Sequence, residues 1–262
     1  MEEQIIGFDK VTKRYKKNER ALTNLSMSID KGEFVFITGP SGSGKTTILK
    51  LLYKDIKHNA GDIVVLRQPI HSWNERKIRR RLGFIFQNYE LIENKNVYNN
   101  VVYPLQILGK NPFTSRKKAL DMIDKVGLSA HIKKRPSELS GGQQQRVAVA
   151  RAMVTEPDII LCDEPTGNLD DKNSDKIIEL LKDLNQHNDT TILITTHDKR
   201  IIDKYGDRII MIENGVLVED HFMTSENRVE TQSKLHRFFE ENKKYHNQES
   251  DTNEDHAIEE EY

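Results

Sequence analysis

The feature that most constrains this chain is a glycine-rich segment at 39–46 with the sequence GPSGSGKT. It fits the pattern G-x-x-x-x-G-K-[ST] and lies between an apolar run, FVFIT, and a helix-like run that begins at Lys45. Glycines let successive backbone N–H groups turn towards one anion, and a helix start adds its positive dipole end. The segment, called the phosphate loop below, therefore predicts a nucleotide-binding turn between a strand and a helix.

The residue types of the phosphate loop indicate how it would hold a nucleotide. Lys45 supplies a point charge to the β- and γ-phosphates, and the Thr46 hydroxyl is a ligand for Mg²⁺. The residues expected to surround the phosphates are Gly39, Pro40, Ser41, Gly42, Ser43, Gly44, Lys45, Thr46 and Thr47. Kinases, GTPases and many ATPases share such a loop, so later segments must discriminate among these classes.

A second segment, IILCDEP at 159–165, ends a predicted buried strand in two adjacent carboxylates. Asp163 is expected to reach the Mg²⁺ shell, and Glu164 is expected to polarise an attacking water as general base. The alternative is the solvated start of a loop. The phosphate loop upstream disfavours that alternative.

A third segment, LSGGQ at 139–143, opens an apparent helix that continues to about Val154. Ser140 is a good helix cap, and the two glycines after it allow a ligand to approach the backbone closely, so the segment is a second candidate anion site. Taken alone, the segment fits a plain structural cap equally well.

These segments together carry a family resemblance. LSGGQ between a phosphate loop and a strand ending in Asp-Glu resembles the signature sequence of the ATP-binding-cassette (ABC) ATPases, and the resemblance runs from about residue 4 to about residue 220. It implies that ATP is bound and hydrolysed with Mg²⁺. It also implies a dimer in which each ATP is contacted by the signature of a second copy of the chain, through Leu139, Ser140, Gly141, Gly142 and Gln143.

Four further positions match the family's site. Gln87 resembles the glutamine that reaches Mg²⁺ and senses a membrane partner, and His197 resembles the switch histidine that contacts the γ-phosphate. Tyr15 resembles the aromatic residue that stacks on adenine, with an ordinary core or surface tyrosine as the alternative, and Asp170 of GNLD resembles the D-loop residue that contacts the opposing subunit. The resemblance thus implies Glu164, His197 and Gln87 as catalytic residues, and Thr46, Gln87 and Asp163 as Mg²⁺ ligands.

Apolar runs and helix-like runs alternate along most of the chain. Strands are predicted at 33–38, 83–86, 158–162, 190–195 and 208–212, and helices at 45–53, 115–125, 142–155 and 175–185. This order predicts an α/β fold, a P-loop NTPase with an ABC-type core around a mainly parallel sheet. The first forty residues suggest an N-terminal antiparallel β layer, and 88–151 suggest an inserted helical subdomain.

The ABC ATPase domain is predicted to span residues 1–222, and residues 223–262 are predicted to form an acidic tail. The chain carries 40 Lys+Arg against 41 Asp+Glu, whereas the tail has a clear acidic excess and few apolar residues. We expect this tail to be largely disordered apart from a short helix at about 235–241. Its widely spaced histidines, together with His221, are interpreted as solvated rather than metal-binding.

Charge and hydropathy limit the class of partner. The near-neutral net charge of −1 gives no support for a nucleic-acid partner, and no run of eighteen apolar residues is present to span a bilayer. The start of the chain lacks the pattern of a secretory signal, and the single cysteine, Cys162, excludes an internal disulfide. The expected location is peripheral, on the cytoplasmic face of a membrane, with an integral membrane partner.

Several runs, including GFIFQNYELI and DEPTGNLD, resemble one branch of the family. That branch contains the FtsE cell-division ATPases, the lipoprotein-release ATPases and the macrolide or antimicrobial-peptide export ATPases. The run LLYK at 51–54 is most similar to the FtsE type, which implies an FtsX-type partner and control of cell-wall hydrolases. An export or lipoprotein-release role is the alternative, and a non-transport ABC ATPase acting on nucleic acid is a remote one.

Overall fold

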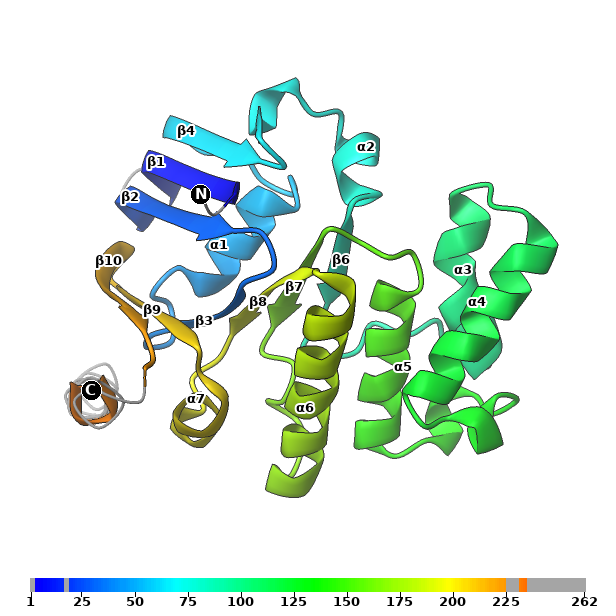
Figure 1. Ribbon diagram of the computed structural model, residues 1–262. Coiled ribbons are helices and arrows are strands. Elements are labelled where there is room, and N and C mark those ends of the chain that lie inside the picture. The colour runs from blue at the N-terminus through cyan, green and yellow to red at the C-terminus, as the bar shows by residue number, and fades with distance from the viewer. Residues whose placement is uncertain (1–2, 17–18, 225–230, 235–262) are drawn as a thin grey trace, which may run out of the picture.

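The structure is a computed structural model, in which residues 3–16, 19–224 and 231–234 are described. Its centre is a six-stranded sheet in the order β10-β9-β3-β8-β7-β6, parallel throughout except for β10 (Figure 1). The strands are β3 (Phe34–Thr38), β6 (Leu82–Ile85), β7 (Ile159–Asp163), β8 (Thr191–Thr195), β9 (Arg208–Glu213) and β10 (Val216–Phe222). The predicted α/β fold with a mainly parallel sheet is confirmed.

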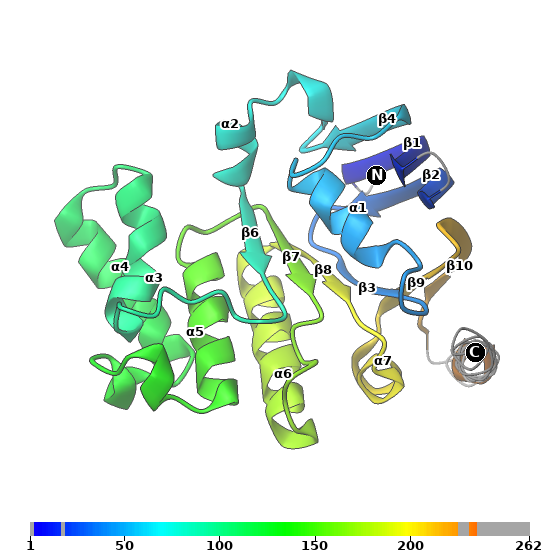
Figure 2. The same ribbon diagram turned by 180° about the vertical axis from the view of Figure 1, so that it is seen from behind.

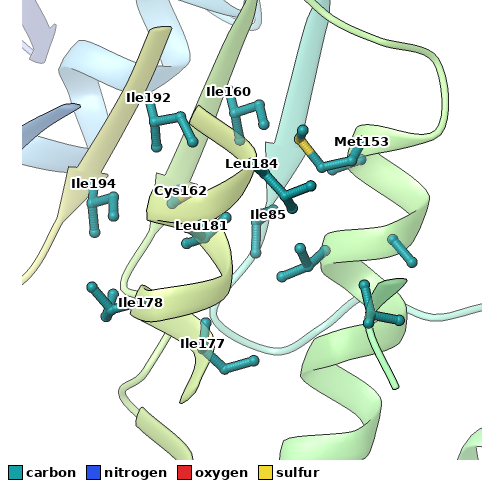
Figure 3. Close-up of a cluster of buried hydrophobic side chains, with 14 of the residues drawn as sticks. Ile85, Met153, Ile160, Cys162, Ile177, Ile178, Leu181, Leu184, Ile192 and Ile194 are labelled. Atoms are coloured by element: carbon teal, nitrogen blue, oxygen red, sulfur yellow. The ribbon is translucent and has the colours of Figure 1, made fainter. Parts of the chain in front are cut away.

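Both faces of this sheet are buried, and alternate residues of one strand serve opposite faces. Ile160 and Cys162 of β7 pack in one hydrophobic cluster, while Ile159 and Leu161 pack in the other, and all four are fully buried. Figure 3 shows the first cluster, in which Leu181 and its neighbours in α6 (Asp171–Asn188) cover β7 and β8. The near-continuous apolar strands seen in the sequence follow from this double coverage.

A second, antiparallel sheet has the order β2-β1-β4-β5. It contains β1 (Gln4–Lys16), β2 (Glu19–Asp30), β4 (Ala60–Val65) and β5 (Gln68–Pro69). The predicted β layer over the first forty residues thus ends at Asp30 and is completed by β4 from further along the chain. Residues 34–38 join the main sheet instead, because all five are buried and such a strand needs cover on both faces.

Helix α1 (Lys45–Leu52) lies between the two sheets (Figure 1), and its apolar residues belong to the cluster that contains side chains from both. On the other face of the main sheet lie α6 and α7 (Lys199–Tyr205). Short elements complete this part: α2 (Glu75–Arg79) and a 3-10 turn at Ile70–Ser72.

Residues 88–151 hold helices and turns and no strand. They contain α3 (Val97–Ile107), α4 (Pro112–Lys125), most of α5 (Gly141–Met153) and 3-10 turns at Ser129–His131 and Pro136–Glu138. Figure 2 shows α3, α4 and α5 side by side at one end of the molecule. The fully buried Asn100 fixes the segment that enters α3, since its side chain accepts from Ile92 N at 2.8 Å and donates to the carbonyl oxygen of Lys95 at 3.1 Å.

The predicted helix at 235–241 and the tail histidines His236, His246 and His256 lie outside the described residues. His221 lies in β10 and contacts the Glu219 carboxylate at 2.5 Å. Among the described residues, no group of three or more His, Cys, Asp or Glu side chains is arranged to hold a metal ion. The same part of the chain contains no helix with the length and apolar character needed to cross a bilayer.

Candidate functional site

The phosphate loop follows β3 and leads directly into α1. Gly39 has φ 151° and Gly44 has φ 107°, backbone conformations that favour glycine. A Cβ atom at Gly39 would lie 2.0 Å from the Ile212 carbonyl oxygen, and one at Gly44 would lie 2.5 Å from the Ala21 carbonyl oxygen. Strands of both sheets thus lie so close to the loop at Gly39 and Gly44 that only glycine fits at these two positions.

The side chain of Lys45 is hydrogen-bonded to the backbone of this loop. Its Nζ donates to the carbonyl oxygens of Gly39 and Pro40, at 2.8 Å each, and the residue is 6% exposed. Burial lowers the pKa of the ammonium group, and the nearby carboxylates of Glu164 and Asp163 oppose that shift. The result is a partly desolvated cation beside the loop, which is the charge that phosphate recognition needs.

Asp163 meets two hydroxyl groups at the carboxyl end of β7. Its Oδ1 accepts from Thr46 Oγ1 at 3.0 Å and from Thr195 Oγ1 at 2.7 Å. Thr195 lies opposite Asp163 in the register of β7 and β8, so the parallel pairing of these strands places it there. A carboxylate beside the Thr46 hydroxyl offers the hard oxygen ligands that Mg²⁺ prefers, so these residues fit that ion.

Glu164 and His197 form a close pair. His197 Nδ1 lies 3.0 Å from Glu164 Oε1, and the two side chains are 65% and 22% exposed respectively. The hydrogen bond to His197 lowers the pKa of Glu164, although burial opposes it, and the bond to Glu164 raises the pKa of His197. Glu164 is thereby kept ionised, as a general base must be before it accepts a proton.

Gln87 approaches the same group of residues. A Cβ atom at Gly167 would lie 3.2 Å from Gln87 Nε2 and 3.6 Å from Glu164 Oε2, so the two side chains converge beside this glycine. The next residue, Asn168, donates from Nδ2 to the Gln87 carbonyl oxygen at 3.1 Å. Oε1 of Glu164 contacts His197, and Oε2 is the oxygen on the side of Gly167.

Tyr15 lies beside the end of the phosphate loop. Its hydroxyl is 3.3 Å from Thr47 Oγ1, and the residue is 46% exposed. Lys13 Nζ lies 5.1 Å from the ring centre. An open aromatic face next to the loop suits a stacked base, and the role in adenine binding stays a prediction.

The signature forms the start of α5 and satisfies its own hydrogen bonds. Ser140 Oγ accepts from Gln143 N at 3.4 Å, while Gln143 Oε1 accepts from Ser140 N at 2.9 Å, which makes a capping box. Cβ atoms at Gly141 and Gly142 would lie 3.0 Å from Tyr89 Oη and from Asn173 Cγ. Within the described residues, no hydrogen bond or ion pair links the signature to the phosphate loop. The structure thus gathers Lys45, Thr46, Gln87, Asp163, Glu164 and His197 and leaves residues 139–143 outside that group.

Asp170 has a structural role within its own chain. It caps α6, with Oδ1 accepting from Asn173 N at 2.9 Å and Oδ2 accepting from Asn173 Nδ2 at 2.6 Å. These hydrogen bonds lower the pKa of Asp170. The predicted contact of Asp170 with a second copy stays a prediction.

Sequence reasoning missed several residues that hold the site in place. Thr195 binds Asp163 through its hydroxyl and also accepts, through its carbonyl oxygen, from Glu164 N at 3.1 Å. Arg151 of α5 donates from Nη2 to the Tyr89 carbonyl oxygen at 2.8 Å, which ties α5 to the segment after Gln87. The polar threonine that follows the apolar residues ILI in TTILIT was the available signal for Thr195.

Comparison with known proteins agrees with this geometry. Residues 22–167 match the family model described as ABC transporter. The chain is 40% identical over 219 residues to the cell division ATP-binding protein FtsE of Streptococcus pneumoniae, which covers 82% of this chain and 95% of that protein. It is 42% identical over 220 residues, with the same shares, to FtsE of Mycobacterium tuberculosis. The methionine import ATP-binding protein MetN of Coxiella burnetii is 36% identical over 227 residues, which is 84% of this chain and 65% of that protein.

Solved structures of ABC cassettes have the same fold. A dimeric ATP-binding cassette in a post-hydrolysis state with ADP and Pi superposes with a TM-score of 0.76 and 36% identity, over 84% of this chain and all of that one. A Clostridium perfringens cassette from an ABC transporter complex gives a TM-score of 0.81 and 27% identity, over 90% and 94% of the two chains. The chain therefore belongs to the ABC transporter family, as an ATP-binding and ATP-hydrolysing protein similar to the FtsE cell-division proteins.

Proposed function

We propose that this chain is an FtsE-like ATPase that dimerises on ATP and passes the resulting motion to an integral membrane partner of the FtsX type. The observation that carries the catalytic part is the convergence of Lys45, Asp163, Glu164 and His197 at the carboxyl ends of parallel strands. The match over 95% of FtsE, against 65% of MetN, favours the cell-division type over import. Its expected output is control of cell-wall hydrolases.

Each converging group has a role in hydrolysis that its environment supports. Lys45 binds the β- and γ-phosphates, and His197 holds the γ-phosphate from the opposite side. Glu164 accepts the proton of the attacking water at Oε2, the oxygen on the side of Gly167, and Gln87, which lies beside the same glycine, would orient that water. Thr46, Asp163 and Gln87 would hold Mg²⁺, which supplies charge neutralisation on the phosphates when bound.

The signature contributes to a site on a second copy. Its helix start is exposed at Ser140 and has its own caps satisfied, so it is ready to face an anion without rearrangement. The similar cassette described as dimeric in the ADP and Pi state supports a functional pair of chains. We infer that ATP lies between the phosphate loop of one chain and the signature of the other.

A cavity of about 630 Å³ between α2, β6, α3 and α5 is where we place the membrane partner. Its lining includes four arginines and one carboxylate, Glu90, together with apolar side chains such as Phe86 and Ile107, the latter 62% exposed. The arginines are Arg76, Arg79, Arg80 and Arg151. This chemistry fits an acidic, partly apolar cytoplasmic segment of the partner, which would hold the chain at the cytoplasmic face of the membrane.

The dimer is tested with the Glu164→Gln variant, which is expected to bind ATP without hydrolysing it. Light scattering after size exclusion is expected to show a dimer with ATP and a monomer with ADP. Adding Ser140→Asp to this variant should abolish the dimer while ATP binding persists. A Glu164→Gln chain that stays monomeric at saturating ATP would contradict the proposed dimer.

The membrane partner is tested by capture from membranes with a tagged chain. A small membrane protein with a single extracellular loop domain is expected, whereas a permease with a large extracellular insert would support export. The double variant Arg76→Glu/Arg80→Glu should lose the partner and keep its own ATPase activity. The matched control, Arg116→Glu/Lys117→Glu, makes the same charge change on exposed residues of α4 outside the cavity and should retain the partner.

A further inference from the structure

A network of charged side chains joins the N-terminal part of α6 to α7. Arg200 Nη1 lies 2.5 Å from Asp175 Oδ1, and Lys204 Nζ lies 2.8 Å from Asp175 Oδ2. Asp175 is 24% exposed, and both cations lower its pKa, with Lys204 the larger cause. This part of the network holds the two helices together.

Arg200 also reaches the two segments that adjoin the catalytic site. Its Nη2 lies 3.4 Å from the carbonyl oxygen of Asp171, the residue after the D-loop Asp170. The same nitrogen lies 3.9 Å from Asp198 Oδ2, and Asp198 follows the switch residue His197. One guanidinium group therefore contacts the residue next to each of these site residues.

The contact on the D-loop side is incomplete. Arg200 Nε is buried and has no hydrogen-bond partner among the described residues. Asp171 Oδ1 lies 3.4 Å from this nitrogen, which is an ion-pair distance without the alignment of a hydrogen bond. A buried donor without a partner is unfavourable, so a small shift of Asp171 towards Arg200 would be stabilised.

At the other end of the network, Asp198 is hydrogen-bonded to residues on both sides of His197. Asp198 caps α7 by accepting from Ile201 N at 3.3 Å, and its own N–H donates to Thr196 Oγ1 at 3.0 Å. His197 lies between these two residues and contacts Glu164. The backbone on both sides of His197 is therefore tied to the first turn of α7.

We propose that Arg200 is a positioning residue that couples the D-loop to the switch histidine. When a second copy displaces Asp170 and Asp171, Arg200 completes its bond to Asp171 and carries the shift into α7, which adjusts the Glu164–His197 pair. Hydrolysis thereby depends on whether the opposing copy is engaged. This coupling rests on the dimer proposed above.

The test is a double-mutant cycle read out in kcat, KM and Tm. Arg200→Ala is expected to lower kcat about tenfold and to leave the KM for ATP within about twofold, because the phosphate loop is untouched. Asp171→Asn should lower kcat by a similar factor, and the double variant should lose no more than either single one. Asp175→Asn, the matched control within the same network, should lower Tm with a much smaller effect on kcat.

Arg200→Lys separates positioning from simple stability. Lysine keeps the charge opposite Asp175 but lacks the planar fork that reaches Asp171 and Asp198 together, so Tm should recover while kcat stays low. Full recovery of kcat in Arg200→Lys, or losses of log kcat that simply add in the Arg200/Asp171 cycle, would overturn the coupling. The ATP-driven dimer of the Glu164→Gln chain is measured alongside. If that chain does not dimerise with ATP, the proposed dimer is contradicted. If it does dimerise but the losses of log kcat in the Arg200/Asp171 cycle add, only the role of Arg200 is contradicted.

Discussion

The phosphate loop and the signature are both glycine-containing helix starts, yet their surroundings differ. Around the phosphate loop, charged groups from three strand ends converge, and Lys45 is buried with its pKa lowered. At the signature, Ser140 and Gln143 satisfy each other's hydrogen bonds, and in the described part of the chain no lysine, arginine or carboxylate side chain bonds to either of them. The first region holds the groups that we propose act in hydrolysis. The second is a helix start whose own hydrogen bonds are already made and which can face a ligand bound by another copy of the chain.

The largest expected effect belongs to the first region. Glu164→Gln should lower kcat by about 10²- to 10⁴-fold, since it removes the proposed general base, while ATP binding persists. Steady-state phosphate release and nucleotide titration measure the two properties. Glu93→Gln makes the same chemical change at an exposed position and should have no effect. Wild-type turnover in Glu164→Gln would show that another group accepts the proton.

A charge change at the signature should separate the two regions. Ser140→Asp keeps a good helix cap but places a negative charge where an anion is expected, so turnover should fall by roughly tenfold or more while ATP binding by the single chain is unchanged. Ser140→Asn is the matched control, because it keeps the cap and adds no charge. Equal activities of these two variants would mean that the signature is only a cap. Lys45→Ala, in contrast, should lose ATP binding itself.

The Glu164–His197 pair predicts a pH dependence of stability. In the folded chain the pKa of Glu164 is lowered from 4.5 and that of His197 is raised from 6.5. The pair therefore stabilises the fold fully between about pH 4.5 and 6.5, and this is lost as pH falls through the lowered pKa or rises through the raised one. The Tm difference between wild type and His197→Gln should be largest in that window. It should be small, because His197 is mostly exposed, and a difference that does not vary with pH would contradict the pair.

The smallest effect is expected at the cap of α6. Asp170→Ala should lower Tm slightly, because it removes the hydrogen bonds to Asn173, whereas Asp170→Asn should lower Tm much less. Thermal unfolding measures both. If Asp170→Asn preserves Tm but lowers turnover, Asp170 has a role beyond its cap. Unchanged turnover would confine it to the structural role.

The features that could be predicted from the sequence are those formed by residues close together along the chain. The phosphate loop, the Asp163–Glu164 pair and the buried strands are each encoded within about ten positions. The edge strand β10 was missed because its residues alternate between exposed and partly buried, which leaves no continuous apolar run. Helix α7 was missed because it has only seven residues.

Other features depend on contacts between distant segments, which no local pattern reports. Arg200 meets Asp175 across 25 positions, and Arg151 meets Tyr89 across 62. The cavity lined by Arg76 and Arg151 arises only when α2 and α5 fold against β6.

The hydrogen bonds from Lys45 to Gly39 and Pro40 have a consequence for how ATP arrives. A phosphate oxygen would compete with these two carbonyl oxygens for the same ammonium group. The affinity for ATP therefore includes an exchange of hydrogen-bond partners at Lys45, in which bonds to the loop backbone are traded for a charge-assisted bond to the phosphate.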